Sequence, residues 1–290
     1  MNKDQEQKAI ERLKFFEPLN GQPYYLAYSG GKDSDVILAL ADMANVRFEA
    51  VHNLTTVDAP ETVYHVRSKG VRIDKPERTM WQLIVDKRYP PTRVVRYCCS
   101  YLKERGGHRR TVVTGVRKAE SVARDKNGGL VKIIGNPKAT VAKAEEMGVE
   151  YEGTAKGGII INNNDNGKSR EFVEHCTMQA KVLVNPIVDW TDDDVWEFLR
   201  VHGIKTNPLY ECGYKRIGCI GCPMASKHRY KQFEDYPIYR ANYVRAFEKM
   251  LKAREDHGNK TSTSWIDGEH VMRWWLEEDP AQIKFEDLYT

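Results

Sequence analysis

Short apolar runs alternate with polar, glycine-rich turns along this chain, and the alternation predicts strands and helices in turn. The runs at 24–28, 47–52 and 111–116 have the length and composition of buried strands. The stretch 36–41 is apolar nearly all round, as expected for a helix that packs against a sheet. Elements in this order favour an α/β fold with a doubly wound parallel sheet, whose ligands lie beyond the carboxyl ends of the strands.

The turn after the first strand carries the most specific pattern in the sequence. It reads Ser-Gly-Gly-Lys-Asp-Ser over residues 29–34, and a helix is expected to begin at about Asp33. A glycine turn that feeds a helix gathers free backbone N–H groups at the positive end of the helix dipole, which suits a phosphate. Leu26 and Asp33 rule out the Walker pattern, and no dinucleotide fingerprint is present.

This six-residue turn resembles the pyrophosphate loop of the N-type ATP pyrophosphatases, the adenine nucleotide alpha-hydrolase superfamily. Those enzymes hold the β,γ-pyrophosphate of ATP and expose the α-phosphorus to an acceptor. The resemblance implies catalytic roles for Lys32 and Asp33, and the structural alternative is an ordinary glycine turn. The nucleotide contacts that it implies come from Ser29, Gly30, Gly31, Lys32, Asp33 and Ser34.

Two later segments follow predicted strands and resemble parts of the phosphoadenylyl-sulfate (PAPS) reductase family. Thr56 and Asp58 lie where that family has its second nucleotide-contacting loop, with turn and capping chemistry as the alternative. Gly115, Arg117 and Arg124 belong to a Gly-x-Arg-x-x-x-Ser-x-x-Arg run that, in the family, contacts the nucleotide or its anionic partner. Two arginines seven apart on one helix can face one anion, and the alternative is a solvated basic helix start.

The cysteines are expected to be metal ligands or reactive thiols rather than disulfides. The first sixteen residues are crowded with charged and amide side chains and show no secretory signal. No apolar run approaches the roughly 20 residues that cross a bilayer. The protein is therefore expected to be soluble and cytoplasmic, without membrane partners, in a compartment that keeps its six cysteines reduced.

Four of these cysteines form two close pairs, Cys98-Cys99 and Cys219-x-x-Cys222. A Cys-x-x-Cys turn with Gly inside and Pro after it directs both sulfurs at one metal. Adjacent cysteines do not easily bond to each other, because the small ring strains the disulfide torsion. The tandem pair with a distant Cys-x-x-Cys resembles the adenylyl-sulfate reductase branch, which implies a [4Fe-4S] cluster. A zinc site and buried structural thiols are the alternatives.

The chain is expected to divide into three parts, and the resemblance covers the middle of it. Gly and Asn concentrate at about 125–181, which predicts an insertion in the core. Within it, residues 159–161 and 171–173 flank an Asn-rich turn and suggest a β-hairpin. The three parts are an N-terminal amphipathic helix in 1–22, the nucleotide-binding core in 23–190 and a helical region with the Cys-x-x-Cys turn in 191–290.

Two departures from the reductase pattern change the expected chemistry. The reductases use a nucleophilic cysteine on a C-terminal tail, but the residues after Cys222 include none, and Cys212 lies in a different context. Those reductases also usually carry a degraded phosphate loop, whereas residues 29–34 are complete. Both departures favour ATP-dependent adenylation coupled to sulfur transfer, as in the relatives that thiolate tRNA or place phosphorothioates in DNA.

The leading hypothesis is an ATP pyrophosphatase with an iron–sulfur cluster that adenylates an acceptor oxygen so that sulfur can displace it. The loop N–H groups and Lys32 would stabilise the departing pyrophosphate, and Asp33 or Asp58 would help to hold Mg²⁺. The sulfur would come from a donor such as a cysteine desulfurase, and an oligomer is compatible with this scheme. The rivals are a sulfonucleotide reductase with Cys212 as nucleophile and a non-catalytic nucleotide-sensing subunit.

One segment points to a nucleic-acid acceptor. Residues 86–126 hold twelve Lys or Arg and four acids, a net +8 inside a chain of +4. Charge concentrated beside the expected active-site edge is typical of a polyanion site. The sequence therefore predicts weak, salt-sensitive binding through Arg105, Arg109 and Arg110. The alternative is that Arg117 and Arg124 serve the nucleotide and the other basic residues are solvated.

Overall fold

The computed structural model describes residues 3–135, 137–154, 158–162, 167–177, 180–258 and 265–277. They form two compact units, each assembled from interleaved segments, whereas the sequence predicts a boundary near residue 190. Unit 1 comprises Met1–His52, Glu61–Ile73 and Gly106–Ile217, and unit 2 comprises Asn53–Pro60, Asp74–Arg105 and Gly218–Thr290.

Unit 1 is built on an eight-stranded sheet of order β3-β2-β1-β4-β8-β5-β7-β6. Strand β1 is parallel to β2 and β4, and β4 is parallel to β8. Strands β5, β7 and β6 continue the sheet in antiparallel fashion. The predicted α/β fold with a mostly parallel sheet is confirmed. The strands are β1 Tyr24–Ala27, β2 Phe48–Asn53, β3 Arg72–Asp74, β4 Thr111–Val113, β5 Val131–Ile134, β6 Glu152–Gly153, β7 Ile159–Ile161 and β8 Lys181–Val184.

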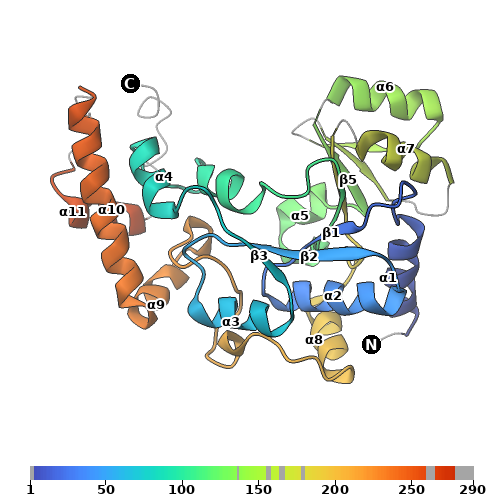
Figure 1. Cartoon of the computed structure of the whole chain (residues 1–290), viewed down its shortest axis with the longest axis horizontal. Helices are drawn as coiled ribbons and strands as arrows, with labels where there is room; N and C mark the ends of the chain where they lie inside the picture. The colour runs from blue at the N-terminus through green and yellow to red at the C-terminus, as the bar shows by residue number, and fades with distance from the viewer. Residues whose placement is uncertain are drawn as a thin grey trace. The chain divides into compact units, whose positions relative to one another are not determined.

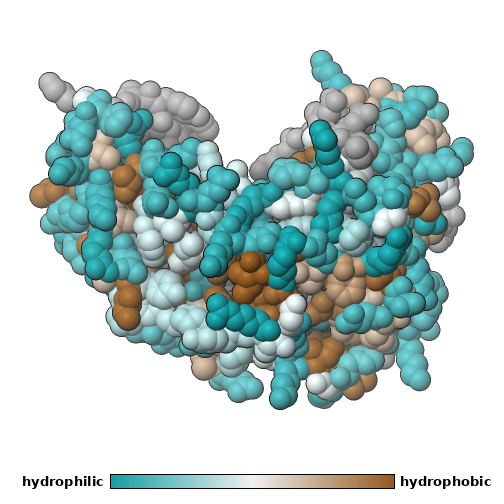
Figure 2. All heavy atoms as spheres, in the orientation of Figure 1, coloured by the Kyte–Doolittle hydropathy of each residue, from teal (hydrophilic) through white to brown (hydrophobic). Residues whose placement is uncertain are grey.

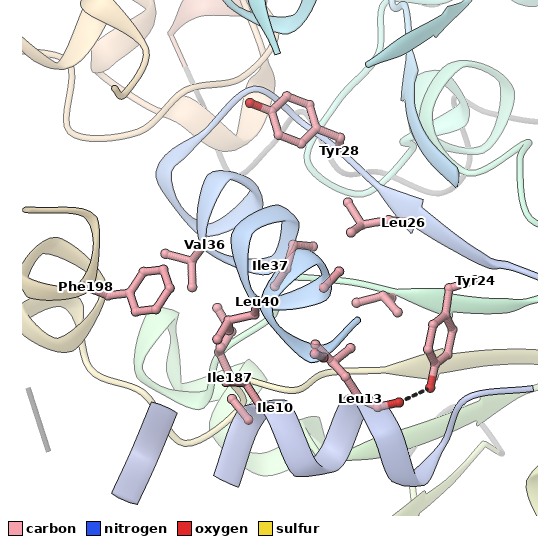
Figure 3. Close-up of a cluster of buried hydrophobic side chains, with 14 of the residues drawn as sticks. Ile10, Leu13, Tyr24, Leu26, Tyr28, Val36, Ile37, Leu40, Ile187 and Phe198 are labelled. Carbon is pink, nitrogen blue, oxygen red and sulfur yellow. Dashed lines mark hydrogen bonds between the residues drawn. The ribbon is translucent and has the colours of Figure 1, made fainter. Parts of the chain in front are cut away.

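The helices of unit 1 pack on this sheet through apolar faces. Figure 1 shows α2 running along the sheet with α8 beside it. Figure 3 shows the cluster between them, in which Ile37 and Leu40 of α2 lie near Leu13 of α1 and Phe198 of α8. The described helices are α1 Lys3–Phe15, α2 Lys32–Ala44, α3 Pro60–Ser68, α5 Val122–Asn127, α6 Pro137–Met147, α7 Gly167–Thr177 and α8 Asp192–Val201.

The predicted N-terminal helix is confirmed as α1, and side-chain hydrogen bonds help to hold it against the rest of unit 1. The Tyr24 hydroxyl donates to the Leu13 carbonyl at 2.8 Å, as the dashed line in Figure 3 shows. The Arg12 guanidinium, 5% exposed, donates to both carboxylate oxygens of Asp189 at 2.7 and 2.8 Å. A bidentate arginine–carboxylate pair adds directional hydrogen bonds to the apolar packing.

The predicted β-hairpin in the Gly- and Asn-rich stretch is wrong. Residues 171–173 lie within α7, where Phe172, Val173 and Cys176 are buried together at helical spacing. Strand β7 pairs instead with β5, so the stretch completes the sheet rather than standing apart from it. Residues 163–166, where the sequence places the turn, lie outside the described part of the chain.

The strand register aligns the elements that carry the candidate site. Leu26 pairs with Val113, and Val113 pairs with Val184, so β1, β4 and β8 run side by side in the same direction. The segments that follow these strands therefore leave the sheet at one edge. They are the Ser-Gly-Gly loop, the segment that contains Gly115 and the segment that leads into α8.

Unit 2 is mostly helical, with an aromatic core. Helix α10 packs against α4 and α11, as Figure 1 shows. Tyr243 and Trp275 lie with ring centroids 4.8 Å apart, and Phe233 and Phe247 pack around them. The described elements are α4 Met80–Lys87, a π-helical turn Cys99–Lys103, a 3₁₀ turn Pro223–Ala225, α9 His228–Asp235, α10 Pro237–Asp256 and α11 Gly268–Leu276.

Among the described residues, no helix combines the length and apolar character that a membrane crossing requires. On the face shown in Figure 2, hydrophilic residues cover most of the surface, and hydrophobic residues gather in small groups. Isolated apolar groups of this kind are normal on folded proteins.

Candidate functional site

The Ser-Gly-Gly loop adopts the strand–turn–helix geometry that the sequence predicts. Gly30 has φ +79°, and a Cβ there would lie 2.7 Å from Thr62 Cγ2, so the backbone and the packing both require glycine. Helix α2 begins at Lys32, and its N-cap residue, Gly31, has no side chain that could cap it. The Lys32 N–H donates instead to the Tyr210 hydroxyl at 2.9 Å. The helix presents the positive end of its dipole at the edge of the sheet.

Two buried cations and two carboxylates lie beside this helix end. Lys32 is 5% exposed and Arg117 is 1% exposed. Asp192 Oδ1 accepts from Lys32 Nζ at 2.9 Å and from Arg117 Nη2 at 2.5 Å. Arg117 Nε donates to Asp33 Oδ1 at 2.6 Å. Burial acts to raise the pKa of Asp192, but the hydrogen bonds from Lys32 and Arg117 outweigh it and lower the pKa.

Gly115 brings the segment after β4 against the loop. A Cβ at this position would lie 2.9 Å from the Asp33 carbonyl oxygen, so only glycine permits the approach. Two residues later, Arg117 reaches the Asp33 carboxylate. The structure thus brings Lys32, Asp33, Gly115 and Arg117 together, as the sequence led us to expect from strands that end at one edge.

The expectation that Arg117 and Arg124 share one helix is wrong. Arg117 is extended at the start of the 3₁₀ turn Lys118–Glu120, whereas Arg124 lies in α5 after an extended Ser121. The Arg124 guanidinium pairs with the Glu120 carboxylate. The two guanidinium groups consequently have different partners, and a contact from Arg124 to a nucleotide stays a prediction.

Three functional candidates were missed from the sequence. One is Asp192, whose signal was an acidic run in the first turn of the helix that follows β8. The others are Asn207, which caps the 3₁₀ turn Pro208–Tyr210, and Tyr210, which is the last residue of that turn. Asn207 Nδ2 donates to the Gly30 carbonyl at 3.0 Å, and the Lys32 N–H donates to the Tyr210 hydroxyl at 2.9 Å. Neither contact has a sequence signature, because about 177 positions separate the partners.

Ser29 and Ser34 face each other across the loop, with their hydroxyl oxygens 3.3 Å apart. Thr56 and Asp58 belong to unit 2 and are described within it. Thr56 has φ +65°, and its hydroxyl accepts from the Met80 N–H at 2.9 Å. Asp58 Oδ2 accepts from the Thr55 N–H at 2.6 Å. These are the turn and capping contacts of the structural alternative, and nucleotide contacts from the pair stay a prediction.

All six cysteines are free thiols, and four of them line one cavity in unit 2. The cavity is bounded by Cys98, Cys99, Cys219 and Cys222 together with Lys103 and Tyr243. Within the described residues, no three His, Cys, Asp or Glu side chains are close enough to form a metal-coordination shell. Four thiols on one cavity are nevertheless the donor set that an iron–sulfur cluster or zinc takes, so the residues fit either group by chemistry.

The Cys-x-x-Cys turn is braced by the aromatic core. Gly221 has φ +74°, and a Cβ there would lie 2.6 Å from Phe233 and 2.9 Å from Tyr243. The Gly221 N–H donates to Gln232 Oε1 at 2.9 Å. The Tyr243 hydroxyl donates to the Ile220 carbonyl at 3.0 Å. These contacts hold the turn that carries Cys219 and Cys222.

Electrostatics favour thiolate at one of these positions. A hydrogen bond from the Cys98 thiol, aided by the cations Lys103 and Arg96, lowers the pKa of Cys99. The same hydrogen bond raises the pKa of Cys98. Burial raises the pKa of Cys219, while Cys219 in turn raises the pKa of Lys103. A cavity that holds a cation beside four thiols is suited to a group bound by thiolates.

Two of the three arginines predicted to grip nucleic acid have structural partners. Arg110 Nη1 donates to Glu49 Oε2 at 2.6 Å. In unit 2, Arg105 donates to the backbone carbonyls of Asp74 and Lys75. Arg109 is exposed, with φ +54°. Nucleic-acid binding through these three arginines stays a prediction, and Arg105 and Arg110 also have contacts within the fold.

Residues 23–225 of the 290 match the family model of the phosphoadenosine phosphosulfate reductase domain. This chain belongs to that family. The match covers both the Ser-Gly-Gly loop and the four cysteines. It confirms the predicted resemblance to the PAPS reductases, whose named members are enzymes that act on nucleotides.

Individual relatives of this PAPS reductase family chain are distant. An uncharacterized protein of Methanocaldococcus jannaschii is 24% identical over 307 aligned positions, which cover 98% of this chain and 60% of that protein. The chain thus spans about three fifths of that relative's length. The adenosine 5'-phosphosulfate reductase of Allochromatium vinosum is 45% identical over 42 residues, 14% of this chain and 16% of that enzyme.

Among solved structures, the chain is similar to the U34-tRNA thiolase NcsA of Methanococcus maripaludis with its [4Fe-4S] cluster. It is 12% identical, with a TM-score of 0.40, and the comparison covers 91% of this chain and 82% of that chain.

Proposed function

We propose that this chain is an ATP pyrophosphatase that adenylates an acceptor for sulfur transfer and releases pyrophosphate. The observation that carries the proposal is the position of two buried cations, Lys32 and Arg117, at the N-terminus of α2. Two cations at the positive end of a helix dipole can neutralise a polyphosphate, whose β and γ groups carry most of the charge.

The chain's own residues would act on the leaving group. The acceptor oxygen attacks the α-phosphorus, the bond from that phosphorus to the bridging oxygen breaks, and pyrophosphate leaves with the electron pair. Lys32 and the loop N–H groups oppose the charge that develops on the departing pyrophosphate. Asp192 and Asp33 hold the two cations in place, and Asp33 is also a candidate ligand for the Mg²⁺ that accompanies ATP.

The four cysteines of unit 2 would hold a [4Fe-4S] cluster, which supplies a site that can bind and activate a sulfur species. Cys98 and Cys99 come from the start of the π-helical turn, and Cys219 and Cys222 come from the braced Cys-x-x-Cys turn. Family membership supports this role for the cysteines, with zinc as the alternative occupant. The sulfur donor would be a persulfide-bearing protein such as a cysteine desulfurase.

A sulfonucleotide reductase is the second candidate, and the family match favours it directly. That reaction needs a nucleophilic cysteine. Cys212 is exposed and lies two residues after Tyr210, on the segment that contacts the loop. The complete Ser-Gly-Gly-Lys-Asp-Ser loop favours a substrate with a pyrophosphate, so ATP is preferred over a sulfonucleotide as the proposed substrate.

Product analysis of the anaerobically purified protein tests the proposal. The chain is incubated in parallel with ATP and with adenylyl sulfate plus a dithiol, and the products are separated by ion-exchange chromatography. An ATP pyrophosphatase forms AMP and pyrophosphate in equal amounts, in greater yield when tRNA or DNA is added. Sulfite and AMP from adenylyl sulfate, with ATP untouched, would establish the reductase instead. Binding of ATP without any product would indicate a nucleotide-sensing subunit.

A further inference from the structure

The segment Asn207–Tyr210 contacts the phosphate loop at two adjacent points. Asn207 is fully buried, and its Nδ2 donates to the Gly30 carbonyl at 3.0 Å and to Thr62 Oγ1 at 3.1 Å. Its own Oδ1 accepts from the Leu209 N–H at 3.1 Å, which closes the turn that carries Tyr210. The loop and this turn are thus fixed to each other on the side of the Gly30 carbonyl.

Tyr210 makes the second contact, at the helix end itself. The Lys32 N–H, the first of α2, donates to the Tyr210 hydroxyl oxygen at 2.9 Å. A Cβ built on Gly31 would lie 3.3 Å from the same hydroxyl, so this oxygen lies directly over the loop. The Trp196 ring packs edge-on against the Tyr210 ring at 5.0 Å and supports its orientation.

The Tyr210 hydroxyl keeps a proton to donate. Burial, together with the carboxylates of Asp33 and Asp192, raises its pKa well above the ordinary value, so the group is neutral. Its oxygen accepts from Lys32, and in the described part of the chain no acceptor contacts its own proton. A hydroxyl that accepts one hydrogen bond becomes a better donor of the next. The Tyr210 side chain is half-buried, and a donor in such a position is normally satisfied by a ligand or water.

We propose that Tyr210 is a phosphate-contacting residue of the loop, whose hydroxyl donates a hydrogen bond to an oxygen of the bound pyrophosphate group. The inference rests on the proposed function and names a residue from outside the Ser-Gly-Gly motif. Tyr210 extends the donor set of the α2 N-terminus by one group, while Asn207 is a positioning residue that holds the turn against the loop.

The test measures binding of inorganic pyrophosphate by titration calorimetry to the anaerobically purified chain and to Tyr210→Phe. The substitution keeps the ring and its Trp196 contact, and a circular dichroism melt verifies the fold. Loss of one hydrogen bond to a charged ligand should weaken pyrophosphate binding about 10- to 100-fold. The control is Tyr64→Phe, on the exposed face of α3, which should bind like the native chain.

Each result decides the inference. Equal binding by Tyr210→Phe would overturn it, and tighter binding would show that the hydroxyl competes with the anion for the Lys32 N–H. A native chain that does not bind pyrophosphate would overturn it as well. Because the titration needs no turnover, weaker binding by Tyr210→Phe in a chain that forms no AMP would uphold the contact and refute the pyrophosphatase. AMP formation with unaltered binding in the variant would do the reverse.

Discussion

Asp192 Oδ1 accepts a hydrogen bond from Lys32 Nζ at 2.9 Å across 160 positions of sequence. The two residues begin α8 and α2, which are the helices that follow β8 and β1. The pair therefore ties together two segments that leave the sheet at one edge. It also holds the lysine ammonium beside the helix N-terminus, where the pyrophosphate of the proposed reaction would lie.

Replacing Lys32 with Ala should slow AMP formation about 10²- to 10³-fold, since one preorganised donor to the developing charge is lost. The melting temperature should change little, because Asp192 keeps its contact with Arg117. The control is Lys143→Ala on α6, which removes only a surface pair with Glu146. Steady-state assays of both variants make the comparison, and an unaltered rate in Lys32→Ala would exclude the assignment.

Anaerobic purification should yield a brown protein with about four irons and four sulfides per chain. Substitution of Cys98, Cys99, Cys219 or Cys222 by Ser should abolish the visible absorption. Cys176→Ser should retain it, because Cys176 lies buried in α7 of unit 1. Iron and sulfide analysis provides the measurement. A colourless chain with one equivalent of zinc would instead indicate a structural metal site.

Gly221→Ala should destabilise unit 2 and reduce its metal content. The new methyl group would lie 2.6 Å from Phe233, at a backbone angle that L-residues disfavour. Overpacking and strain together should cost about 2–4 kcal/mol in the free energy of unfolding. Gly218→Ala is the matched control, because a Cβ at that position would meet no other atom within 4 Å. Urea unfolding and iron analysis of both variants compare them, and equal behaviour would contradict the packing argument.

Asp189 should make stability fall in acid. Burial acts to raise its pKa, but the hydrogen bonds and charges of Arg12 and Lys8 outweigh it and lower the pKa from 3.8 to about 2. A carboxyl whose pKa is lowered on folding stabilises the folded protein at pH values above its ordinary pKa of 3.8. That contribution is lost as the pH falls through the folded-state pKa of about 2. Because the carboxylate is 39% exposed, we expect about 1 kcal/mol.

Urea unfolding between pH 5 and pH 2 measures this contribution. Asp189→Asn should lower stability at pH 5 and flatten the decline toward pH 2 relative to the native chain. Glu171→Gln, at an exposed position of α7, should leave the curve unaltered. An Asp189→Asn curve that runs parallel to the native one would show that the pair adds no acid-sensitive stability.

If the acceptor is nucleic acid, binding should weaken linearly in a plot of log affinity against log salt. Arg109→Ala should reduce the magnitude of that slope by about one if the side chain contacts one phosphate. Arg200→Ala, an exposed arginine of α8 outside the basic segment, serves as control. Fluorescence anisotropy with a labelled tRNA makes the measurement. No binding even at low salt would favour a small-molecule acceptor or a partner protein that supplies the contact.

Local chemistry determined much of this protein in advance. The strand before Ser29, the glycine turn and the helix after it follow from backbone rules that involve neighbouring residues only. Thr191 and Asp194 cap α8 reciprocally, as their three-residue spacing predicts. The fold class followed from the order of such elements. The prediction of a β-hairpin was wrong because residues 171–173 are compatible with either a strand or a helix. Burial of Phe172 together with Cys176 favoured the helix.

Only the tertiary structure decided which side chains complete the site. A motif reports that Lys32 follows a glycine turn, but it cannot report that Asp192 and Tyr210 lie against it, because those contacts depend on the packing of β8 and of the turn after α8. In the same way, the arginines at 105 and 110 read as free charges in the sequence and acquired partners on folding. The amino-acid composition gives the number of charged side chains, but only the folded structure determines which of them have hydrogen-bond or ion-pair partners.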